Sequence, residues 1–247
     1  EAWWKREGFV VGSYWSYPPA PQPHEDVPPP PEPASLEQQY KDVDYNVQRM
    51  HYTMAHSAFP LDTVPIGNLE FGPGTLALYL GSEPLYDVDS LWFQPTIEHA
   101  QDPRSTGELR FDPDNLWWRI SWEVAQRCQA QAAGKYLVRP PDLVENIDIL
   151  ASLRESSTML IDLIESPEWV LEKVHEIDNV WFEVFERFYQ LLKGEDGSSC
   201  FHFGLWGPGR TAKVQCDVAA MISQDMFRQF AQPALQRQCD YLDYSMY

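Results

Sequence analysis

The fold is decided by residues 166–193, which read SPEWVLEKVHEIDNVWFEVFERFYQLLK, and by residues 200–206, which read CFHFGLW. The first three residues predict a helix start, because they supply an N-cap serine, a first-turn proline and a first-turn acid. The apolar residues then recur every three or four positions and form one stripe, made of Val170, Val174, Ile177, Trp181, Val184, Phe188 and Leu191. Residues 200–206 are continuously apolar, as in parallel strands covered on both faces. A long helix packed on a parallel sheet is therefore predicted.

Strands and helices alternate on both sides of this stretch. Strands or extended segments are predicted at residues 8–15, 63–68, 90–97 and 136–139. Helices are predicted at residues 35–59, at 74–80, from a cap at Asp112 to Gly134, and from a cap at Ser223 to about Cys239. Such alternation favours parallel pairing with right-handed crossovers, either in a doubly wound sheet or in a closed barrel. No glycine-rich nucleotide-binding motif follows any of these strands.

The number of units suggests an unfinished fold. About four strand–helix units can be counted, whereas a (β/α)8 barrel needs eight. Residues 241–247 look like the approach to another strand, so we expect the chain to stop in mid-fold at Tyr247. The chain does not begin with methionine, which indicates further residues upstream of Glu1.

Composition narrows the classes of partner. The chain has 18 Lys and Arg against 37 Asp and Glu, a formal charge of -19, which disfavours nucleic acid and anionic membranes. No run of 18 apolar residues offers a transmembrane helix, and the first residues do not resemble a signal peptide. The four cysteines are far apart and form no CxxC motif, which suits reduced thiols. A cytoplasmic protein acting on small molecules is expected.

Several local patterns carry a family resemblance. Leu153-Arg154-Glu155 is followed by residues 160–163 and 166–170, and then by Gly204-Leu-Trp-Gly-Pro208, Gln215-Cys-Asp217 and Ile222-Ser-Gln-Asp-Met-Phe227 with Phe230 and Pro233. In this order they resemble the third barrel helix, the helix after it, the fourth strand, the active-site loop and the next helix of the uroporphyrinogen decarboxylase superfamily. That superfamily also contains the cobalamin- and coenzyme M-dependent methyltransferases. The match covers about residues 60–247; Glu155 and Gln224 depart from a glycine and a proline usual there.

The resemblance implies an α/β protein with the first half of a (β/α)8 barrel of the TIM type. We accordingly divide the chain into residues 1–34, an N-terminal strand with a proline-rich extension, and residues 35–247, the N-terminal part of the barrel. The methyltransferases of the family use a zinc held by His-x-Cys and a later cysteine, which would lie beyond Tyr247. Zinc, a corrinoid and a corrinoid protein as partner therefore stay open.

The two candidate reactions are ranked by the residues that follow the first predicted strand. Decarboxylases of the family carry an arginine-rich motif after that strand to hold the carboxylates of the substrate, whereas residues 13–18 contain no basic residue. Corrinoid-linked methyl transfer on a small, weakly anionic substrate is therefore expected ahead of decarboxylation in tetrapyrrole biosynthesis. A non-catalytic barrel that binds a ligand or a partner, with the proline-rich residues 18–33 in the contact, is the third alternative.

Candidate site residues follow from position, since barrel enzymes place their chemistry at the carboxyl ends of strands. Asp217 and Asp142 are the expected catalytic carboxylates, each able to accept a proton or to position a ligand. Substrate binding is expected from Asn68, Glu70, Asn146, Asp148, Trp206 and Arg210, and Tyr14 and Trp15 follow the first predicted strand. Structural alternatives stay open: a helix cap for Asp142, an ion pair for Arg210 and a core position for Trp206. Cys200 and His202 share a strand face, but we interpret them as core residues and expect no metal site.

Overall fold

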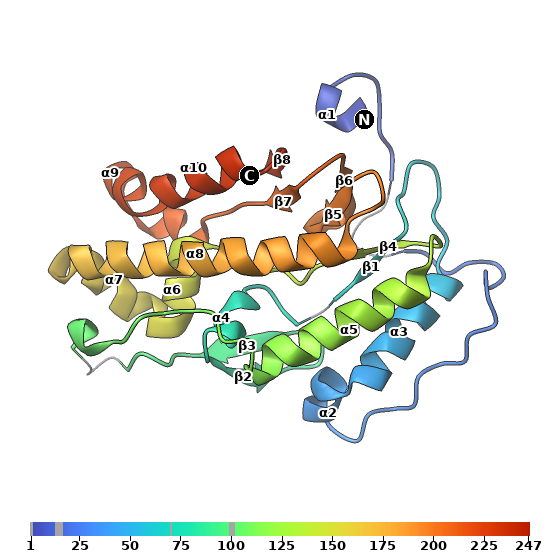
Figure 1. Ribbon diagram of the computed structural model, residues 1–247, viewed down its shortest axis with the longest axis horizontal. Coiled ribbons are helices and arrows are strands. Elements are labelled where there is room, and N and C mark those ends of the chain that lie inside the picture. Colours follow the sequence, from blue (N-terminus) through green and yellow to red (C-terminus); the bar gives the residue numbers. More distant parts are fainter. Residues whose placement is uncertain (1, 13–16, 70, 99–101) are drawn as a thin grey trace.

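Short strands lie in a row through the middle of the molecule, with helices packed around them (Figure 1). In this computed structural model all residues are described except 1, 13–16, 70 and 99–101. Strand β1 (Ile66–Asn68) pairs in parallel with β4 (Leu137–Arg139), and β7 (Thr211–Lys213) pairs in parallel with β8 (Tyr244–Met246). Strand β5 (Ser199–Phe201) lies between β4 and β7. The predicted α/β class is confirmed, although the described residues form no closed barrel.

Three helices cover much of the row. Helix α3 (Val43–His56) packs on α5 (Leu116–Ala132), which packs in turn on α8 (Pro167–Leu192) (Figure 1). The shorter helices are α1 (Ala2–Lys5), α2 (Leu36–Lys41), α4 (Leu76–Tyr79), α6 (Asn146–Arg154), α7 (Ser156–Glu165), α9 (Gln224–Met226) and α10 (Gln232–Tyr241). The remaining turns are 3-10 turns at Pro103–Ser105, His202–Gly204 and Asp217–Met221, and a π turn at Phe227–Ala231. None of the helices within the described part of the chain is long and apolar enough to cross a membrane.

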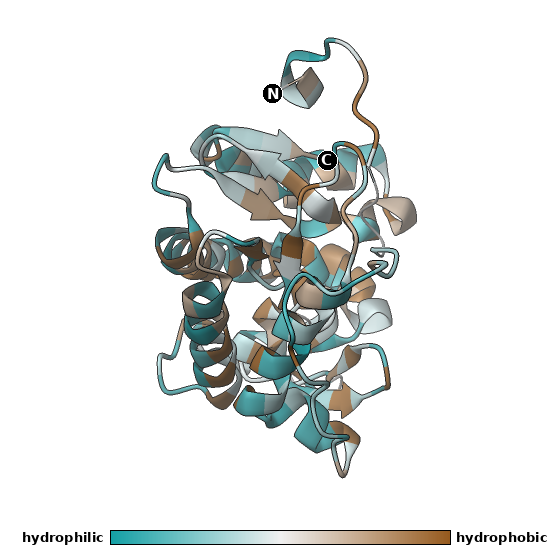
Figure 2. Ribbon diagram, turned by 90° about the vertical axis from the view of Figure 1, so that its right-hand side faces the viewer, coloured by the Kyte–Doolittle hydropathy of each residue, from teal (hydrophilic) through white to brown (hydrophobic). Residues whose placement is uncertain are grey.

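Helix α8 forms as its apolar stripe predicts. Of the seven stripe residues, all except Leu191 are buried, and Pro167 occupies the first turn. Each fully buried aliphatic or aromatic side chain contributes roughly 1.5–3 kcal/mol of hydrophobic free energy. The helices carry hydrophilic residues on their outward faces (Figure 2), so α8 is held by burial of one face against the strands and α5.

The apolar run at residues 200–206 folds differently from its prediction. A single continuous strand is wrong, because β5 ends at Phe201 and β6 (Leu205–Gly207) returns antiparallel to it. Phe203 and Gly204 reverse the chain with φ values of 70° and 65°, in the left-handed region. Apolar content alone does not distinguish a long strand from a hairpin with a tight turn.

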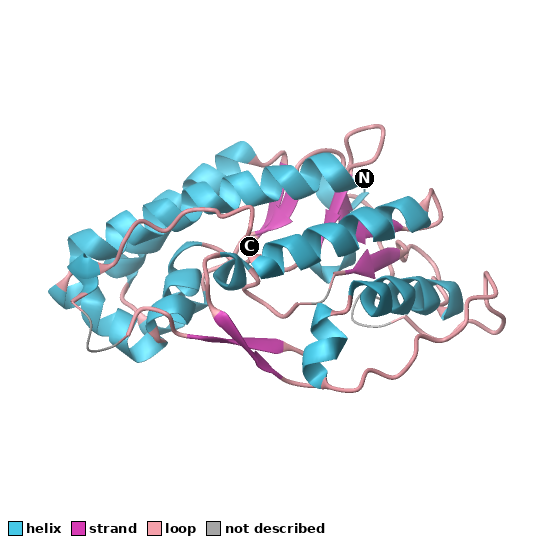
Figure 3. Cartoon of the chain, turned by 60° about the horizontal axis from the view of Figure 1, so that its bottom comes forward, coloured by secondary structure: helices cyan, strands magenta, loops and turns pink. Residues whose placement is uncertain are grey.

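The predicted extended segment at residues 90–97 also pairs differently. Strand β3 (Leu91–Gln94) forms an antiparallel hairpin with β2 (Glu83–Tyr86), apart from the central row (Figure 3). Only four residues separate the two strands, whereas a parallel crossover needs a dozen or more. This hairpin is an addition to the alternating pattern that the sequence predicts.

Two predicted helices have different starts. The helix expected over residues 35–59 is divided at Asp42, whose carboxylate caps α3 by accepting the Tyr45 N–H. Helix α5 begins after Asn115, whose Oδ1 accepts the Trp118 N–H at 3.0 Å, and not at Asp112. The Asp112 carboxylate instead accepts the Asp114 N–H and forms a local turn before the helix.

Both ends of the chain depart from their predictions. The buried strand expected at residues 8–15 is not formed over residues 8–12, where Phe9 is 95% exposed, because this arm pairs with no strand among the described residues. Residues 13–16 lie outside the described residues. The strand expected after Tyr247 lies earlier, at β8. Helix α10 ends at Tyr241, and the Tyr244 N–H already donates to the Arg210 carbonyl at 3.1 Å, which starts the pairing with β7.

Candidate functional site

Asp142 is the centre of a charged cluster at the carboxyl ends of the strands. Lys213, the last residue of β7, places its Nζ 2.9 Å from both oxygens of the Asp142 carboxylate. His202, the first residue after β5, has its Nδ1 3.8 Å from the same carboxylate. The Asp142 carbonyl accepts the N–H groups of Gly74 and Thr75 at 3.0 Å, which ties the loop after β4 to the glycine-rich turn after β1. Segments following four strands therefore meet at one carboxylate.

The neighbouring strand ends add a second cation. Asn68 and Arg139 are the last residues of β1 and β4 and stand opposite each other in the parallel register. The Arg139 Nε donates to Asn68 Oδ1 at 2.5 Å, and Arg139 is only 3% exposed. Asn68 therefore orients a buried guanidinium at this edge.

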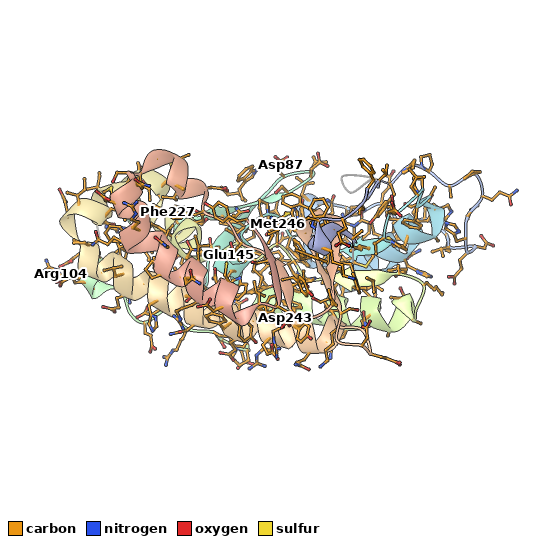
Figure 4. The ribbon with its side chains drawn as sticks, turned by 90° about the horizontal axis from the view of Figure 1, so that it is seen from above. Asp87, Arg104, Glu145, Phe227, Asp243 and Met246 are labelled. Carbon is orange, nitrogen blue, oxygen red and sulfur yellow. The ribbon has the colours of Figure 1, made fainter. Side chains whose placement is uncertain are left out.

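Glu145 is a second, buried carboxyl group beside Lys213 (Figure 4 labels it near the middle of the molecule). Burial raises the pKa of Glu145 well above its ordinary value; Lys213 opposes this rise, and Asp142 adds to it. One of its oxygens accepts the Gln215 N–H at 3.2 Å. Lys213 therefore interacts with two carboxyl groups, those of Asp142 and Glu145, and burial disfavours the charged form of Glu145.

The loop that carries Glu145 is strained. Val144 and Asn146 flank it with φ values of 53° and 43°, a region that a β-branched residue rarely adopts. Asn146 is fully buried, and within the described part of the chain its Nδ2 finds no hydrogen-bond partner. Strain of this kind persists where surrounding structure enforces it, and it concentrates at functional sites.

A cavity of about 30 Å³ lies within the cluster. Its lining includes Asp142, Glu145, His202 and Lys213, with aromatic rings of α8 behind them. This volume accommodates one water molecule, and these four side chains supply polar atoms to an otherwise mainly apolar lining. The ion pair of Asp142 and Lys213 thus borders a small space that is lined mainly by apolar residues.

The carboxylates of Asp148 and Asp217 have different roles. Asp148 is 8% exposed, and its two oxygens accept the N–H groups of Asp217 at 2.7 Å and Val218 at 3.0 Å. It therefore caps the 3-10 turn at residues 217–221 and joins α6 to the loop after β7. Asp217 itself is exposed and accepts a hydrogen bond from the Gln215 side chain at 3.0 Å.

Arg210 and Trp206 lie elsewhere than the sequence suggests. Arg210 precedes β7, so it stands at the opposite end of that strand from Lys213, and its guanidinium donates twice to Glu186 at 3.0 and 3.1 Å. The ion-pair alternative for Arg210 is the arrangement observed. Trp206 lies within β6, opposite Cys200, and its carbonyl accepts the Trp4 Nε1–H at 2.7 Å. Both differences arise because the strand expected to end at residue 206 ends at Phe201.

Glu70, Tyr14 and Trp15 lie outside the described residues. Cys200 and Cys216 are buried, and burial raises the pKa of each thiol to about 12, so both remain protonated. Over the described ranges no three His, Cys, Asp or Glu side chains are grouped to hold a metal ion. The family resemblance places its zinc ligands beyond Tyr247, so a zinc site there stays a prediction.

Sequence reasoning missed four residues of the cluster: Arg139, Glu145, His202 and Lys213. His202 was assigned to the middle of a long strand, and Lys213 could not be recognised as a strand end until β7 was separated from β6. A usable signal existed in the left-handed tendency of Gly204, which permits a turn within the apolar run. Glu145 has no sequence signal, because its burial is a tertiary property.

Comparisons with known proteins identify a similar fold but no family. No protein-family model matches the sequence, and no curated protein matches it. Among solved structures, a methyltransferase from Methanosarcina mazei is similar, with a TM-score of 0.64 and 12% sequence identity. The similarity covers 99% of this chain and 66% of that chain, so this chain spans about two thirds of the length of that protein. At this identity the similarity shows that the two proteins share a fold.

Proposed function

We propose that this chain belongs to an enzyme that transfers a methyl group to or from a small substrate at the Asp142 cluster. The observation that carries the proposal is the meeting of Lys213 and His202 on the Asp142 carboxylate at the carboxyl ends of the strands. Enzymes built on parallel strands place their reacting groups at these ends. The fold shared with a methyltransferase from Methanosarcina mazei supports the reaction class.

The cluster offers the groups that methyl transfer needs. When a methyl group leaves an oxygen or nitrogen atom, that atom keeps the bonding electron pair and becomes more negative. The Lys213 ammonium, which Asp142 holds in place, stabilises such an atom, and a protonated His202 beside the same carboxylate can give it a proton. Burial disfavours the charged form of Glu145, which weakens its competition for the Lys213 ammonium.

The finer parts of the proposal rest on the sequence resemblance. We propose a corrinoid-carrying protein as the partner that exchanges the methyl group, and the central row of strands as one part of a (β/α)8 barrel. The row order β1-β4-β5-β7-β8 and its two parallel pairs support the barrel. Asp142 and Asp217 stay the proposed catalytic carboxylates. Asn68, Glu70, Asn146 and Asp148 stay proposed for substrate binding, whereas Trp206 and Arg210 lie away from the Asp142 cluster.

The test is a transfer assay with substrates that carry a ¹³C-labelled methyl group on oxygen or nitrogen, with reduced cobalamin as the acceptor. Movement of the label is followed by NMR, and methylation of the cobalamin by its visible absorbance. Lys213→Met and Asp142→Asn are each expected to lower turnover about 100-fold, the typical cost of losing one group that stabilises developing charge. Lys193→Met, at the residue that follows α8, is the matched control and should retain turnover.

Removing one charge of a buried ion pair can also destabilise the fold, by roughly 3–5 kcal/mol when the other charge remains. Circular dichroism of each variant separates this effect from lost catalysis, and the double variant Lys213→Met, Asp142→Asn leaves no unpaired charge. Absence of label transfer from every donor, or full turnover in folded Lys213→Met, would sink the proposal.

Decarboxylation is the second candidate. It is favoured by the two cations Arg139 and Lys213 at the strand ends, since such groups hold a substrate carboxylate. Release of ¹³CO₂ from labelled uroporphyrinogen, without label transfer in the methyl assay, would select this alternative.

A further inference from the structure

A cavity of about 550 Å³ lies at the other end of β1 and β4 from the Asp142 cluster. Pro65 and Tyr136, the residues just before these two strands, line it together with side chains of α3. This volume falls within the range of 300–1,000 Å³ typical of pockets for small molecules.

The proline-rich segment forms one wall of the cavity. In Figure 1 this segment runs past α3 on its way to α2. It is held there by backbone hydrogen bonds from Ala20 to the His56 carbonyl, from His24 to the Ala55 carbonyl and from Ala58 to the Pro18 carbonyl, at 2.7–2.8 Å. The wall is therefore formed without a ligand, which reduces the entropy lost on binding.

Part of the cavity surface is aromatic and apolar. The Phe59 ring stacks on the His24 ring at 5.9 Å and meets the Tyr17 ring edge-on at 4.8 Å, which keeps it in place. Met54 and Tyr136 add further apolar surface. A flat or bulky apolar group suits such walls, because aromatic rings gain from stacking as well as from burial.

Charges of both signs stand together in the lining. The Glu25 carboxylate lies 2.5 Å from Lys135 Nζ and 3.5 Å from His51 Nε2. The side chains of Glu25 and Lys135 are 43% and 50% exposed, so their pairing contributes little free energy and opens readily. A ligand with a single charge would match one of the two groups and leave the other without its partner. A ligand with both charges replaces one ion pair by two.

Two buried polar atoms of the lining residues support a polar ligand. Within the described part of the chain, the Tyr136 hydroxyl and His51 Nδ1 have no hydrogen-bond partner, and Tyr136 is only 8% exposed. Buried polar groups are nearly always paired, so each exception calls for an explanation. Both residues line the cavity, so a bound molecule is a suitable partner for these atoms.

We propose that this cavity binds a small zwitterion with an aromatic side chain, of the chemical class of an aromatic α-amino acid. Its ammonium pairs with Glu25 and its carboxylate with Lys135 and His51, while its ring lies against Phe59 and Tyr136. This binding does not depend on the methyl transfer proposed at the opposite ends of the strands.

The experiment is isothermal titration calorimetry of the full chain with four probes. L-tryptophan carries both charges and a ring, tryptamine lacks the carboxylate, indole-3-propionate lacks the ammonium, and glycine lacks the ring. L-tryptophan is expected to bind at least tenfold more tightly than each of the other three, since one charge-assisted hydrogen bond changes affinity by about tenfold or more.

Two variants assign the contacts. Glu25→Gln should weaken L-tryptophan and tryptamine about tenfold without weakening indole-3-propionate. Lys135→Met should weaken L-tryptophan and indole-3-propionate without weakening tryptamine. Glu32→Gln, an exposed acid of the same proline-rich segment, is the matched control. The proposal is overturned by no heat of binding with L-tryptophan, by equal affinity for glycine, or by equal effects of Glu25→Gln and Glu32→Gln.

Discussion

Arg210 shows how far surrounding residues determine the role of a single cation. Its guanidinium lies between the rings of Tyr189 and Tyr241, at 4.9 and 5.2 Å, and donates to both oxygens of Glu186. A planar guanidinium that is stacked and doubly hydrogen-bonded has few donors left for a substrate. Burial raises the pKa of Glu186, but hydrogen bonds from Arg210, Tyr241 and Gln190 outweigh this effect and lower the pKa to about 2.

The lowered pKa of Glu186 predicts a dependence of stability on pH. Because the folded pKa lies below the ordinary value of 4.5, the contribution is fully present above about pH 4.5 and is lost as the pH falls toward 2. Glu186→Gln should remove about 1–2 kcal/mol of unfolding free energy at pH 7, a modest amount because water screens a pair that is one third exposed. The loss should be smaller at pH 2.5, where the carboxylate is partly protonated in the folded protein. Urea unfolding at both pH values measures this. Glu183→Gln, which breaks an exposed pair with Arg187 on the same helix, is the control and should show little change.

Asp148 is predicted to act mainly on stability. Asp148→Asn removes one of the two carboxylate acceptors for the N–H groups of Asp217 and Val218, and should lower the unfolding free energy by about 1–3 kcal/mol. Asp217→Asn changes an exposed carboxylate of the same loop and should cost less than about 0.5 kcal/mol. Thermal unfolding of the two variants measures their losses of unfolding free energy. Equal losses in the two variants would contradict the capping role of Asp148.

At the scale of elements, helix starts are set by hydrogen bonds that sequence patterns only approximate. Asp112-Pro113-Asp114 has the composition of a helix start, yet Asn115 caps α5 and its Nδ2 also donates to the Leu78 carbonyl of α4 at 2.9 Å. Asn115→Ala is therefore expected to destabilise the protein by about 1–2 kcal/mol, and Asp112→Ala by less than about 0.5 kcal/mol. Chemical denaturation of the two variants measures the difference, and the reverse order would show that Asp112 is the cap.

Helix α8 is predicted correctly from the sequence, whereas the hairpin β5–β6 is not. An apolar stripe of seven positions identifies α8 within one residue of its observed ends, because the period of a helix is recorded in the chain itself. The hairpin was read as one strand, because a run of apolar residues has no period that reveals a turn. This single error moved His202, Trp206 and Arg210 to the wrong ends of their strands.

At the scale of the whole molecule, both edges of the strand row are partly covered. The Tyr17 hydroxyl accepts the Ile66 N–H at 3.1 Å and so occupies the free edge of β1. At the other end, β8 pairs only with β7 among the described strands, and the N-terminal arm lies beside it through the Trp4–Tyr244 ring contact at 4.9 Å. Uncovered strand edges promote association between chains.

Removal of the arm contact is predicted to increase self-association. Trp4→Ala loses the Tyr244 contact and the hydrogen bond to the Trp206 carbonyl, which frees the arm from β8. The sedimentation coefficient of this variant should rise more steeply with concentration than that of the unchanged protein. Trp3→Ala, at the half-exposed neighbouring tryptophan, is the control. Identical sedimentation of the three proteins over a tenfold range of concentration would contradict a covering role for the arm.

The sequence by itself determined the α/β class, the helix α8, the strands β1 and β4 and the position of Asp142 after a strand. These features depend on local periodicity, capping and turn composition, which neighbouring residues record. The tertiary arrangement brings Lys213 and His202 to Asp142, buries Glu145 and raises its pKa, and pairs Arg210 with Glu186. These features depend on which distant segments lie side by side. Lys213 and Asp142, for example, are 71 positions apart in the chain, and a shifted pKa likewise depends on neighbours in space.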